Sequence, residues 1–297
     1  MSKLAPVVMF VYNRLDETKR TIESLEKNFL AADSDLFIFA DGPKTSETDT
    51  KVNEVREYIR SIKGFKNIII TEAKRNKGLA KSNIEGISKI FQEHEKAILM
   101  EDDLSTSPNF LSFMNQALDF YGDNKNIISV TGSTFPIDIP TGYKYDVYFS
   151  HRMISYGWGT WADRWNAIDW DLKDYSSFKY NIRENFRFMK GGEDLPRILA
   201  AYKKGKADSW SVRFVYHQYK TGAHSVHAIE SKGVNIGFNS NATHTKRKKK
   251  FDQMNMIEST NTDFSFANEP FIDKKINKSF LKRFTNINRI IANYLTR

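Results

Sequence analysis

The first 132 residues alternate between short apolar runs and segments with helical periodicity, and this alternation limits the fold more than any other feature. We predict strands at 7–12, 36–40, 67–71, 97–100 and 127–130. Helical patterns lie between them at 16–29, 51–62, 79–91 and 108–120. Strands separated by helices of this length form βαβ units, so the sequence predicts an α/β fold with a mostly parallel central sheet flanked by helices.

The pattern loosens after residue 132, where aromatic residues and helical segments replace the regular alternation. Four of the five tryptophans fall within 158–170, and helical patterns recur at 195–205 and 211–222. We predict that 133–245 is the second half of the same domain. The remaining segment, 246–297, is predicted to be a basic linker followed by an amphipathic C-terminal helix.

The composition narrows the class of protein. The chain has no cysteine, which excludes disulfides and cysteine-ligated metal centres. No apolar run approaches the ~20 residues of a membrane span, and the N-terminal run is too short for a signal peptide, so we expect a cytoplasmic protein. Twelve basic and five acidic residues lie in 244–297, so +7 of the net charge of +9 belongs to the tail.

Polar residues follow each of the first four predicted strands, and parallel strands place such residues at one edge of a sheet. These are Asn13-Arg14, Asp41-Gly42, the run 75–78 (RNKG) and the acidic run 101–103 (EDD). Ligands of open parallel sheets bind outside the carboxyl ends of the strands. The mixed charge of this edge suits a ligand that carries both phosphate and hydroxyl groups.

Several common sites are excluded by their missing motifs. No glycine precedes Gly42, whereas a dinucleotide-binding turn needs glycines after the first strand. The one Gly-Lys pair is followed by alanine, which excludes a P-loop. Neither the G-x-S-x-G turn of α/β-hydrolases nor an H-E-x-x-H zinc motif is present. A dehydrogenase, a P-loop nucleotidase and an α/β-hydrolase are therefore disfavoured.

Three adjacent carboxylates, Glu101, Asp102 and Asp103, end the fourth predicted strand. Oxygen ligands of this kind bind hard divalent cations such as Mg²⁺ or Mn²⁺, which in turn bind the phosphates of a substrate. The alternative is a solvated acidic turn, or an acid that caps the following helix. The position beside three other polar turns favours the cation site.

These features resemble the nucleotide-sugar-binding half of GT-A-fold glycosyltransferases. The resemblance rests on the strand-terminal EDD, the early Asn-Arg turn and the Asp-Gly after the second strand. It is strongest to the N-acetylglucosaminyltransferase I type and to bacterial transferases of the family 2 kind, and it covers about residues 5–245. It implies a Rossmann-like nucleotide-sugar half at 1–132 and an acceptor-binding half at 133–245.

The resemblance also implies roles for residues at the donor site. Asp41 would accept a hydrogen bond from a uracil ring, Asn13 and Arg14 would contact the base or diphosphate, and Lys77 would approach the nucleotide. In the acidic run, Asp103 would ligate Mn²⁺ or Mg²⁺, Asp102 would contact the ribose and Glu101 the donor sugar. Thr243 and His244 would approach the diphosphate, with His244 a candidate second metal ligand. The implied donor is a UDP-sugar.

Two acids compete for the role of general base in an inverting transfer. Asp208, in ADSWSVRF, matches the family segment in which an acid precedes a tryptophan. The family pattern of acid-acid-Trp reads Asp208-Ser209-Trp210 here, so its register can slip by one. Asp194, in GGEDLP, is the rival, because related bacterial transferases use an acid pair before a helix. We expect Asp208 to be the base.

Aromatic residues are the predicted sugar-binding surface, because apolar ring faces stack on pyranoses. Trp158 and Trp161 are flanked by glycines and are expected to be exposed, and Trp210 follows the predicted base. Trp165 and Trp170 are equally consistent with the core. The remaining histidines, at 94, 151, 217, 224 and 227, show no ligand spacing.

Two alternative functions are less consistent with the sequence than a transferase. A nucleotidyltransferase would need a glycine-rich, basic first turn, which is absent, and a non-catalytic sugar-binding relative could lose the acids, which are present. The expected acceptor is a glycan or a lipid-linked saccharide, as in bacterial surface polysaccharide synthesis. The tail helix either lies on the inner face of a membrane or packs on the body or across a dimer. Nucleic acid is disfavoured, and the oligomeric state is open.

Overall fold

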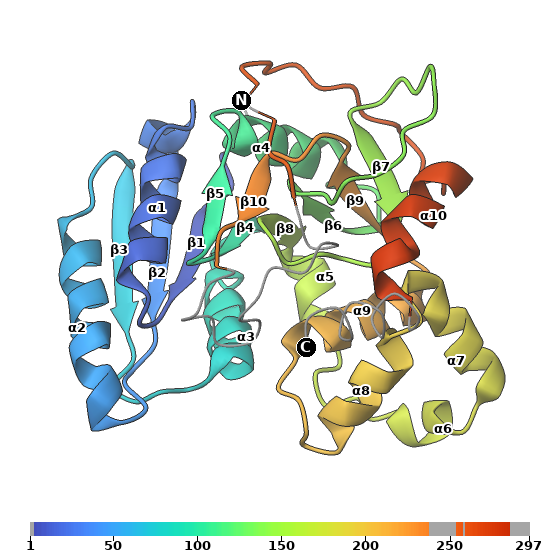
Figure 1. Ribbon diagram of the computed structural model, residues 1–297, viewed down its shortest axis with the longest axis horizontal. Coiled ribbons are helices and arrows are strands. Elements are labelled where there is room, and N and C mark those ends of the chain that lie inside the picture. The colour runs from blue at the N-terminus through green and yellow to red at the C-terminus, as the bar shows by residue number, and fades with distance from the viewer. Residues whose placement is uncertain (1–2, 238–253, 258, 286–297) are drawn as a thin grey trace, which may run out of the picture.

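The alternation predicted for the first 132 residues is confirmed in the structure. The computed structural model describes residues 3–237, 254–257 and 259–285 (Figure 1). The first part of the chain forms, in order, β1 (Val7–Val11), α1 (Leu15–Glu26), β2 (Asp35–Ala40), α2 (Ser46–Ser61), β3 (Asn67–Glu72), α3 (Leu79–Ile90), β4 (Lys96–Glu101), β5 (Leu104–Thr106), α4 (Phe110–Phe120) and β6 (Ile127–Thr131).

The second part is richer in short helices, as the looser sequence pattern suggests. Its elements are β7 (Val147–Ser150), β8 (Trp158–Trp161), α5 (Ala162–Asn166), α6 (Tyr175–Lys179), α7 (Ile182–Phe188), α8 (Leu195–Lys203), α9 (Trp210–Thr221), β9 (His224–Ala228), β10 (Gly233–Asn235) and α10 (Lys274–Leu281), followed by a 3₁₀ turn at Lys282–Phe284. The helices predicted at 195–205 and 211–222 correspond to α8 and α9.

One eight-stranded sheet runs through the described chain in the order β3-β2-β1-β4-β8-β6-β9-β7. The strands β1 to β4 are mutually parallel, and β6 and β9 are parallel to each other. Only β8 and β7 run against their neighbours. The prediction of a mostly parallel α/β sheet is therefore confirmed. A second, two-stranded antiparallel sheet pairs β5 with β10.

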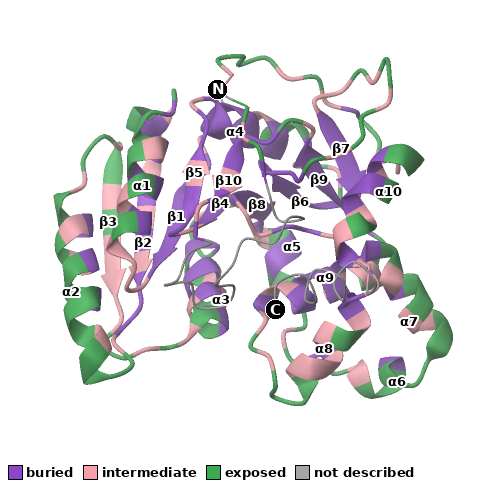
Figure 2. Cartoon of the chain, in the orientation of Figure 1, coloured by how far each residue is buried: buried purple, intermediate pink, exposed green. Residues whose placement is uncertain are grey.

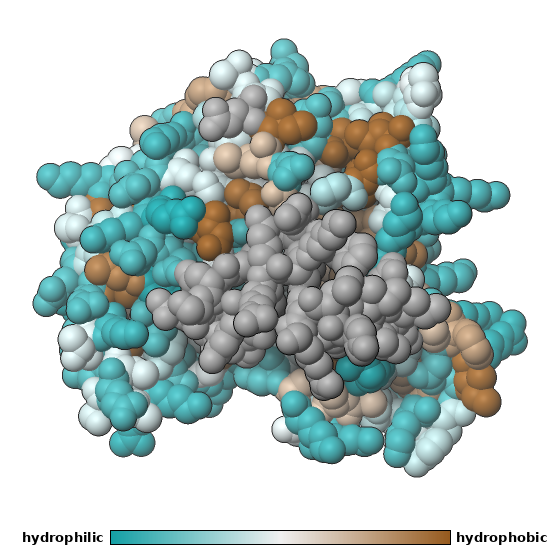
Figure 3. Space-filling view, in the orientation of Figure 1, coloured by the Kyte–Doolittle hydropathy of each residue, from teal (hydrophilic) through white to brown (hydrophobic). Residues whose placement is uncertain are grey.

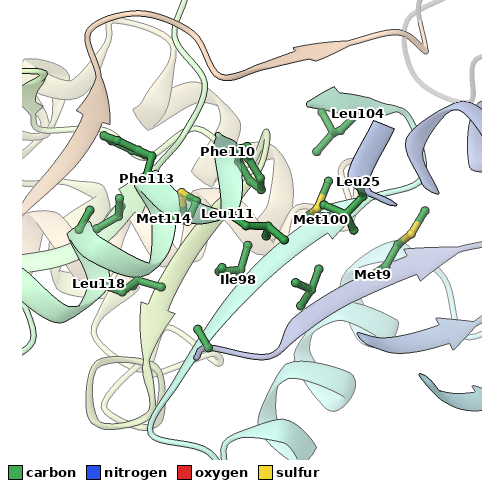
Figure 4. Close-up of a cluster of buried hydrophobic side chains, with 14 of the residues drawn as sticks. Met9, Leu25, Ile98, Met100, Leu104, Phe110, Leu111, Phe113, Met114 and Leu118 are labelled. Atoms are coloured by element: carbon green, nitrogen blue, oxygen red, sulfur yellow. The ribbon is translucent and has the colours of Figure 1, made fainter. Parts of the chain in front are cut away.

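The sheet is covered on both faces, and β1 shows why its sequence is an unbroken apolar run. Successive side chains of a strand point to opposite faces. Val7, Met9 and Val11 join a buried cluster with residues of α1, α2 and α4, part of which is seen in Figure 4. Val8 and Phe10 join a second cluster with residues of α3, α8 and α9. All five residues of β1 are buried (Figure 2).

The first two tryptophans of the tryptophan-rich segment are part of the sheet and not an exposed wall. Trp158 and Trp161 are the first and last residues of β8, which lies between β4 and β6, and they are 2% and 5% exposed. Trp161 donates from Nε1 to the carbonyl oxygen of Leu118 at 3.1 Å. Trp158 stacks on the buried Trp210, with ring centroids 5.2 Å apart. The expectation that Trp158 and Trp161 are exposed is wrong, because a central strand is covered on both faces.

Part of the segment predicted to be a linker lies along helix α4. Asn109 donates to the carbonyl oxygen of Asn261 at 2.7 Å, and the Tyr121 hydroxyl donates to that of Ala267 at 2.9 Å. Phe264 packs edge-on against Phe113, with ring centroids 5.2 Å apart. Residues 261–267 are therefore attached to the body, whereas the basic run 246–250 lies outside the described residues.

Helix α10 also packs on the body. Its apolar residues Ile276 and Phe280 are buried, as is Phe284 in the following turn. They form a cluster with Phe135 and Tyr148. Of the two alternatives for the predicted tail helix, this described part packs on the protein. The continuation of the apolar stripe beyond residue 285 lies outside the described residues.

Removing the Phe280 ring should destabilise the whole protein, because this side chain is fully buried between α10 and the body. We expect Phe280→Ala to lower the free energy of unfolding by about 3–5 kcal/mol. Lys278→Ala, an exposed position on the same helix, is the matched control and should change it by less than about 0.5 kcal/mol. Urea unfolding of both variants measures the difference. Equal stabilities would show that α10 contributes little to the folded body.

Candidate active site

The four polar turns predicted at one edge of the sheet are brought together by the parallel strands that precede them. The carboxyl ends of β1, β2, β3 and β4 all point to the lower edge of the sheet in Figure 1. Arg14, after β1, contacts the acidic turn after β4. Asp41, after β2, contacts the loop after β3. The edge is therefore built from two separate pairs of turns.

The acidic turn is held by Arg14. This guanidinium donates from Nη2 to Asp102 Oδ1 and to Asp103 Oδ2, the second at 2.9 Å. Both carboxylates are buried, at 5% and 7% exposure. Arg14 precedes α1, so the start of this helix is tied to the end of β4. Thr21 of α1 adds a hydrogen bond to the carbonyl oxygen of Asp102 at 2.8 Å.

Two residues that were not predicted from the sequence complete the surroundings of Asp103. Asn235, at the end of β10, donates from Nδ2 to Asp103 Oδ1 at 3.0 Å. Gly237 lies directly against the carboxylate, and a Cβ at this position would be 2.1 Å from Asp103 Oδ2. The pairing of β5 with β10 joins segments about 130 residues apart, and no local sequence signal announces it.

The charge of the acidic turn is not balanced by the groups that surround it. Burial raises the pKa of Glu101 to about 8, with further increases from Asp103 and Asp102, and only Arg14 acts in the opposite direction. Burial also raises the pKa of Asp102 to about 6, against the opposing effect of Arg14. A pKa raised to about 8 keeps Glu101 mainly protonated near pH 7, so the carboxylates of Asp102 and Asp103 face one guanidinium and leave about one excess negative charge in a poorly solvated position.

The carboxylates of the acidic turn are suitable ligands for a divalent cation whose remaining ligands come from a substrate. Carboxylate oxygens are the ligands that Mg²⁺ and Mn²⁺ prefer, and Mg²⁺ sites commonly use one or two carboxylates together with substrate phosphates. Within the described ranges, no group of three histidine, aspartate or glutamate side chains is arranged to hold a metal by itself. The acidic turn therefore fits a site completed by phosphate oxygens and does not form a full protein cage.

Asp41 has a different environment, in which every acceptor position of its carboxylate is used. Oδ1 accepts from the amides of Gly42 and Lys77 at 2.8 and 2.9 Å. Oδ2 accepts from Asn76 Nδ2 and from the amide of Gly78 at 3.0 and 3.2 Å. A carboxylate offers about four lone-pair sites. In this conformation Asp41 orders the loop after β3 and has no lone pair left for a uracil ring.

Close backbone contact between the loops after β2 and β3 explains the glycine that follows Asp41. A Cβ on Gly42 would lie 2.4 Å from the carbonyl carbon of Arg75. Lys77 points along the surface and pairs with Glu85 at 2.7 Å, and both side chains are more than 40% exposed. An exposed pair of this kind contributes little to stability, so Lys77 can turn toward a ligand without a large cost.

The two candidate bases lie in different surroundings. Asp208 is exposed at the start of α9, and a Cβ on Gly78 would lie 3.6 Å from its Oδ2. Asp208 is thus beside the loop that Asp41 orders. Asp194 is fully buried and forms a bidentate pair with Arg152, at 2.7 and 3.2 Å. An acceptor hydroxyl can reach Asp208, whereas it cannot reach Asp194 in this structure.

None of the other predicted site residues that the structure describes is seen at an exposed position beside the acidic turn or Asp208. Asn13 is half-buried beside Arg14. Thr243 and His244 lie outside the described residues. Trp158, Trp161 and Trp210 are buried, as described above, so they cannot stack on a sugar in this structure.

Comparisons with known proteins give the family. The model of glycosyl transferase family 2 matches residues 7–190, which is more than half of the chain. No curated protein matches the sequence. Within the described part of the chain, no helix has both the length and the apolar character needed to cross a bilayer.

Two solved structures illustrate how distant the structural likenesses are. The mannosyltransferase PcManGT from Pyrobaculum calidifontis, solved with GDP-Man and Mn²⁺, shares 8% identity, with coverage of 74% of this chain and 69% of that chain and a TM-score of 0.39. S. aureus TarS, residues 1–349, shares 10% identity, with coverage of 78% and 60% and a TM-score of 0.41. This chain thus spans 60% of the TarS segment, and these likenesses specify neither donor nor acceptor.

The family match agrees with the nucleotide-sugar features read from the sequence and leaves no basis for the nucleotidyltransferase alternative. It covers all four turns at the carboxyl edge of the sheet, including Arg14, Asp41 and Asp103. The chain belongs to glycosyltransferase family 2 and is a nucleotide-sugar-dependent glycosyltransferase.

Proposed function

We propose that the protein is a metal-dependent, inverting transferase that moves a sugar from a UDP-sugar to a glycan or lipid-linked glycan. The observation that carries this proposal is the pairing of an acidic turn of excess negative charge with an exposed carboxylate, Asp208, beside the neighbouring loop. Family 2 enzymes typically use a divalent metal, which agrees with the donor set at Asp103. The UDP preference and the acceptor class rest on the resemblance described above.

In the proposed reaction, the acidic turn and the loops hold the donor, and Asp208 acts on the acceptor. Asp103, with Asp102 beside it, would hold a Mg²⁺ or Mn²⁺ ion, which when bound neutralises the diphosphate that leaves. Arg14 lies on the same carboxylates and would supply a further positive charge near the diphosphate. Asp208 would accept the proton of the acceptor hydroxyl as its oxygen attacks the anomeric carbon, and this inverts the configuration.

Asp41 would act on the donor indirectly. Because its carboxylate is saturated by the loop after β3, it fixes the backbone at Lys77 and Gly78. That loop is one of the turns at the carboxyl edge of the sheet, and it lies beside Asp208. We therefore assign Asp41 to positioning of the loop and place Glu101 beside the donor sugar, as the resemblance implies.

Removal of the Asp103 carboxylate should abolish metal-dependent nucleotide binding. Calorimetric titration of UDP, GDP and dTDP, with and without Mn²⁺, compares the wild type with Asp103→Ala. We expect one nucleotide to bind only with Mn²⁺, and that binding to disappear in the variant. Asp123→Ala, at an exposed turn, is the matched control and should bind normally. Binding that is indifferent to both Mn²⁺ and Asp103 would contradict the cation site.

Asp208→Asn and Asp194→Asn should separate the two candidate bases. We expect Asp208→Asn to lower kcat by about 10²–10⁴-fold with nucleotide affinity unchanged, since it removes a proton acceptor. Asp194→Asn should instead lower the free energy of unfolding by about 3–5 kcal/mol, because the half-buried Arg152 would lose its charged partner. The exposed Asp171→Asn is the control for both. A stable Asp194→Asn variant without turnover, beside an active Asp208→Asn, would reverse the assignment.

Asp41→Asn should loosen the loop after β3. Whichever oxygen is replaced, the new amide group faces two N–H donors, so buried donors lose their acceptor at a cost of about 1–3 kcal/mol. Hydrogen exchange at the amides of Lys77 and Gly78 should become faster, and nucleotide affinity should fall with it. Asp49→Asn, on the exposed side of α2, is the control. Weaker nucleotide binding with unchanged exchange would favour direct contact between Asp41 and the base.

A further inference from the structure

The helices α6 and α7 expose three large apolar side chains at one corner of the molecule. Tyr180, Ile182 and Phe186 are 77%, 73% and 67% exposed, more than any other large apolar residue of the described chain. In Figure 3 apolar side chains protrude at the lower right, at the corner where Figure 1 places α7. Single exposed apolar residues are common, but three within seven residues of a protruding segment call for an explanation.

These exposed side chains are not needed to hold α6 and α7 on the body. The opposite side of the same segment is anchored by Phe178 and Phe188, which are buried and pack edge-on against Tyr216 of α9 at centroid distances of 5.0 and 5.6 Å. The segment therefore has one apolar side that faces the protein and a second that faces outward. The outward side is available to another surface.

The exposed charges around this corner are mainly basic. Between residues 171 and 206, nine of the ten exposed charged residues are basic. The basic ones are Lys173, Lys179, Arg183, Arg187, Lys190, Arg197, Lys203, Lys204 and Lys206. The exposed acid is Asp171. Of the other acids, Asp194 is buried with Arg152, whereas the half-buried Glu184 and Asp174 pair with Arg187 and Lys220. Tyr180, Ile182 and Phe186 (the apolar tips) are therefore surrounded by these nine basic residues (the basic fringe).

The shape and charge of the corner favour binding to an anionic lipid surface over binding to a second protein. The tips protrude, and the hollow beside them, lined by Ile182, Phe186 and Met189, has a volume of only about 380 Å³. Fully exposed side chains of this size present roughly 150–250 Å² each. Three of them supply only part of the ~800 Å² that each partner buries in a standard interface, and the rest would come from the surrounding basic residues, which a second copy of this chain would repel. Apolar tips with basic neighbours are the features by which proteins bind the interface of an anionic bilayer.

We propose that the corner formed by α6, α7 and the start of α8 docks on an anionic lipid surface. Tyr180, Ile182 and Phe186 would enter the interface, and the basic fringe would contact the headgroups. The helices α6 and α8 lie at the same end of the molecule as the carboxyl edge of β1 to β4 (Figure 1). Docking in this manner brings the candidate site toward the membrane. The proposal concerns lipid binding and does not depend on the donor or acceptor.

Co-sedimentation with vesicles tests the proposal. Vesicles of phosphatidylcholine with phosphatidylglycerol are compared with phosphatidylcholine alone, at low and high salt. We expect the full chain to bind only the anionic vesicles and to lose this binding at high salt. The double variant Ile182→Ser/Phe186→Ser should bind these vesicles at least roughly tenfold more weakly than the wild type, because the apolar area that enters the lipid is lost. Arg183→Glu/Lys190→Glu should weaken binding similarly.

The controls separate the corner from the rest of the protein. Phe29→Ser/Phe120→Ser removes two exposed aromatics elsewhere, of 48% and 44% exposure, and should bind vesicles as the wild type does. Thermal unfolding confirms that each variant folds. Absence of vesicle binding by the wild type, or full binding by Ile182→Ser/Phe186→Ser, would overturn the proposal. Self-association that is lost in the same variant, without lipid binding, would instead assign the corner to a second copy of the chain.

Discussion

The contact of Arg14 with Asp102 and Asp103 is the interaction on which the donor edge depends. It joins the residue that precedes α1 to the turn that ends β4, and so it fixes two neighbouring strands at their functional ends. Two buried carboxylates without a cation beside them would be strongly destabilised. One guanidinium offsets only part of the charge of these two carboxylates, and the remaining excess, which also raises the pKa of Glu101, is what makes the turn receptive to a further cation.

The acids of the two turn pairs illustrate how similar residues acquire different roles. Asp41 is surrounded by backbone amides and shares all of its lone pairs with the protein, so it behaves as a fixed part of the loop. Asp103 is contacted by one guanidinium and one side-chain amide, and it lies against a glycine that leaves no room for a side chain. The first arrangement favours rigidity. The second uses fewer of the carboxylate's lone pairs for protein donors, so a cation can compete for the others.

The sequence was sufficient for features set by local pattern. Apolar runs and helical spacing located β1 to β4 and the helices between them, and the common direction of these strands placed Arg14 and the acids at one edge of the sheet. Their direct contact came only from the structure. Features set by distant pairing were missed. Asn235 reaches Asp103 only because β10 pairs with β5. Trp158 and Trp161 were misjudged because flanking glycines suggested an open loop, whereas β8 enters the sheet between β4 and β6.

The two amphipathic segments of the second half show a limit of pattern reading that has a physical cause. An apolar stripe beside basic residues has the same spacing whether protein or lipid covers it, because both remove apolar surface from water. In α10 the stripe is covered by Phe135 and Tyr148, and its basic residues remain at the surface. In α7 the buried side is supplied by Phe188 alone, while Ile182 and Phe186 face outward within a basic fringe. The residues that the structure describes do not cover them, so a second surface would remove them from water.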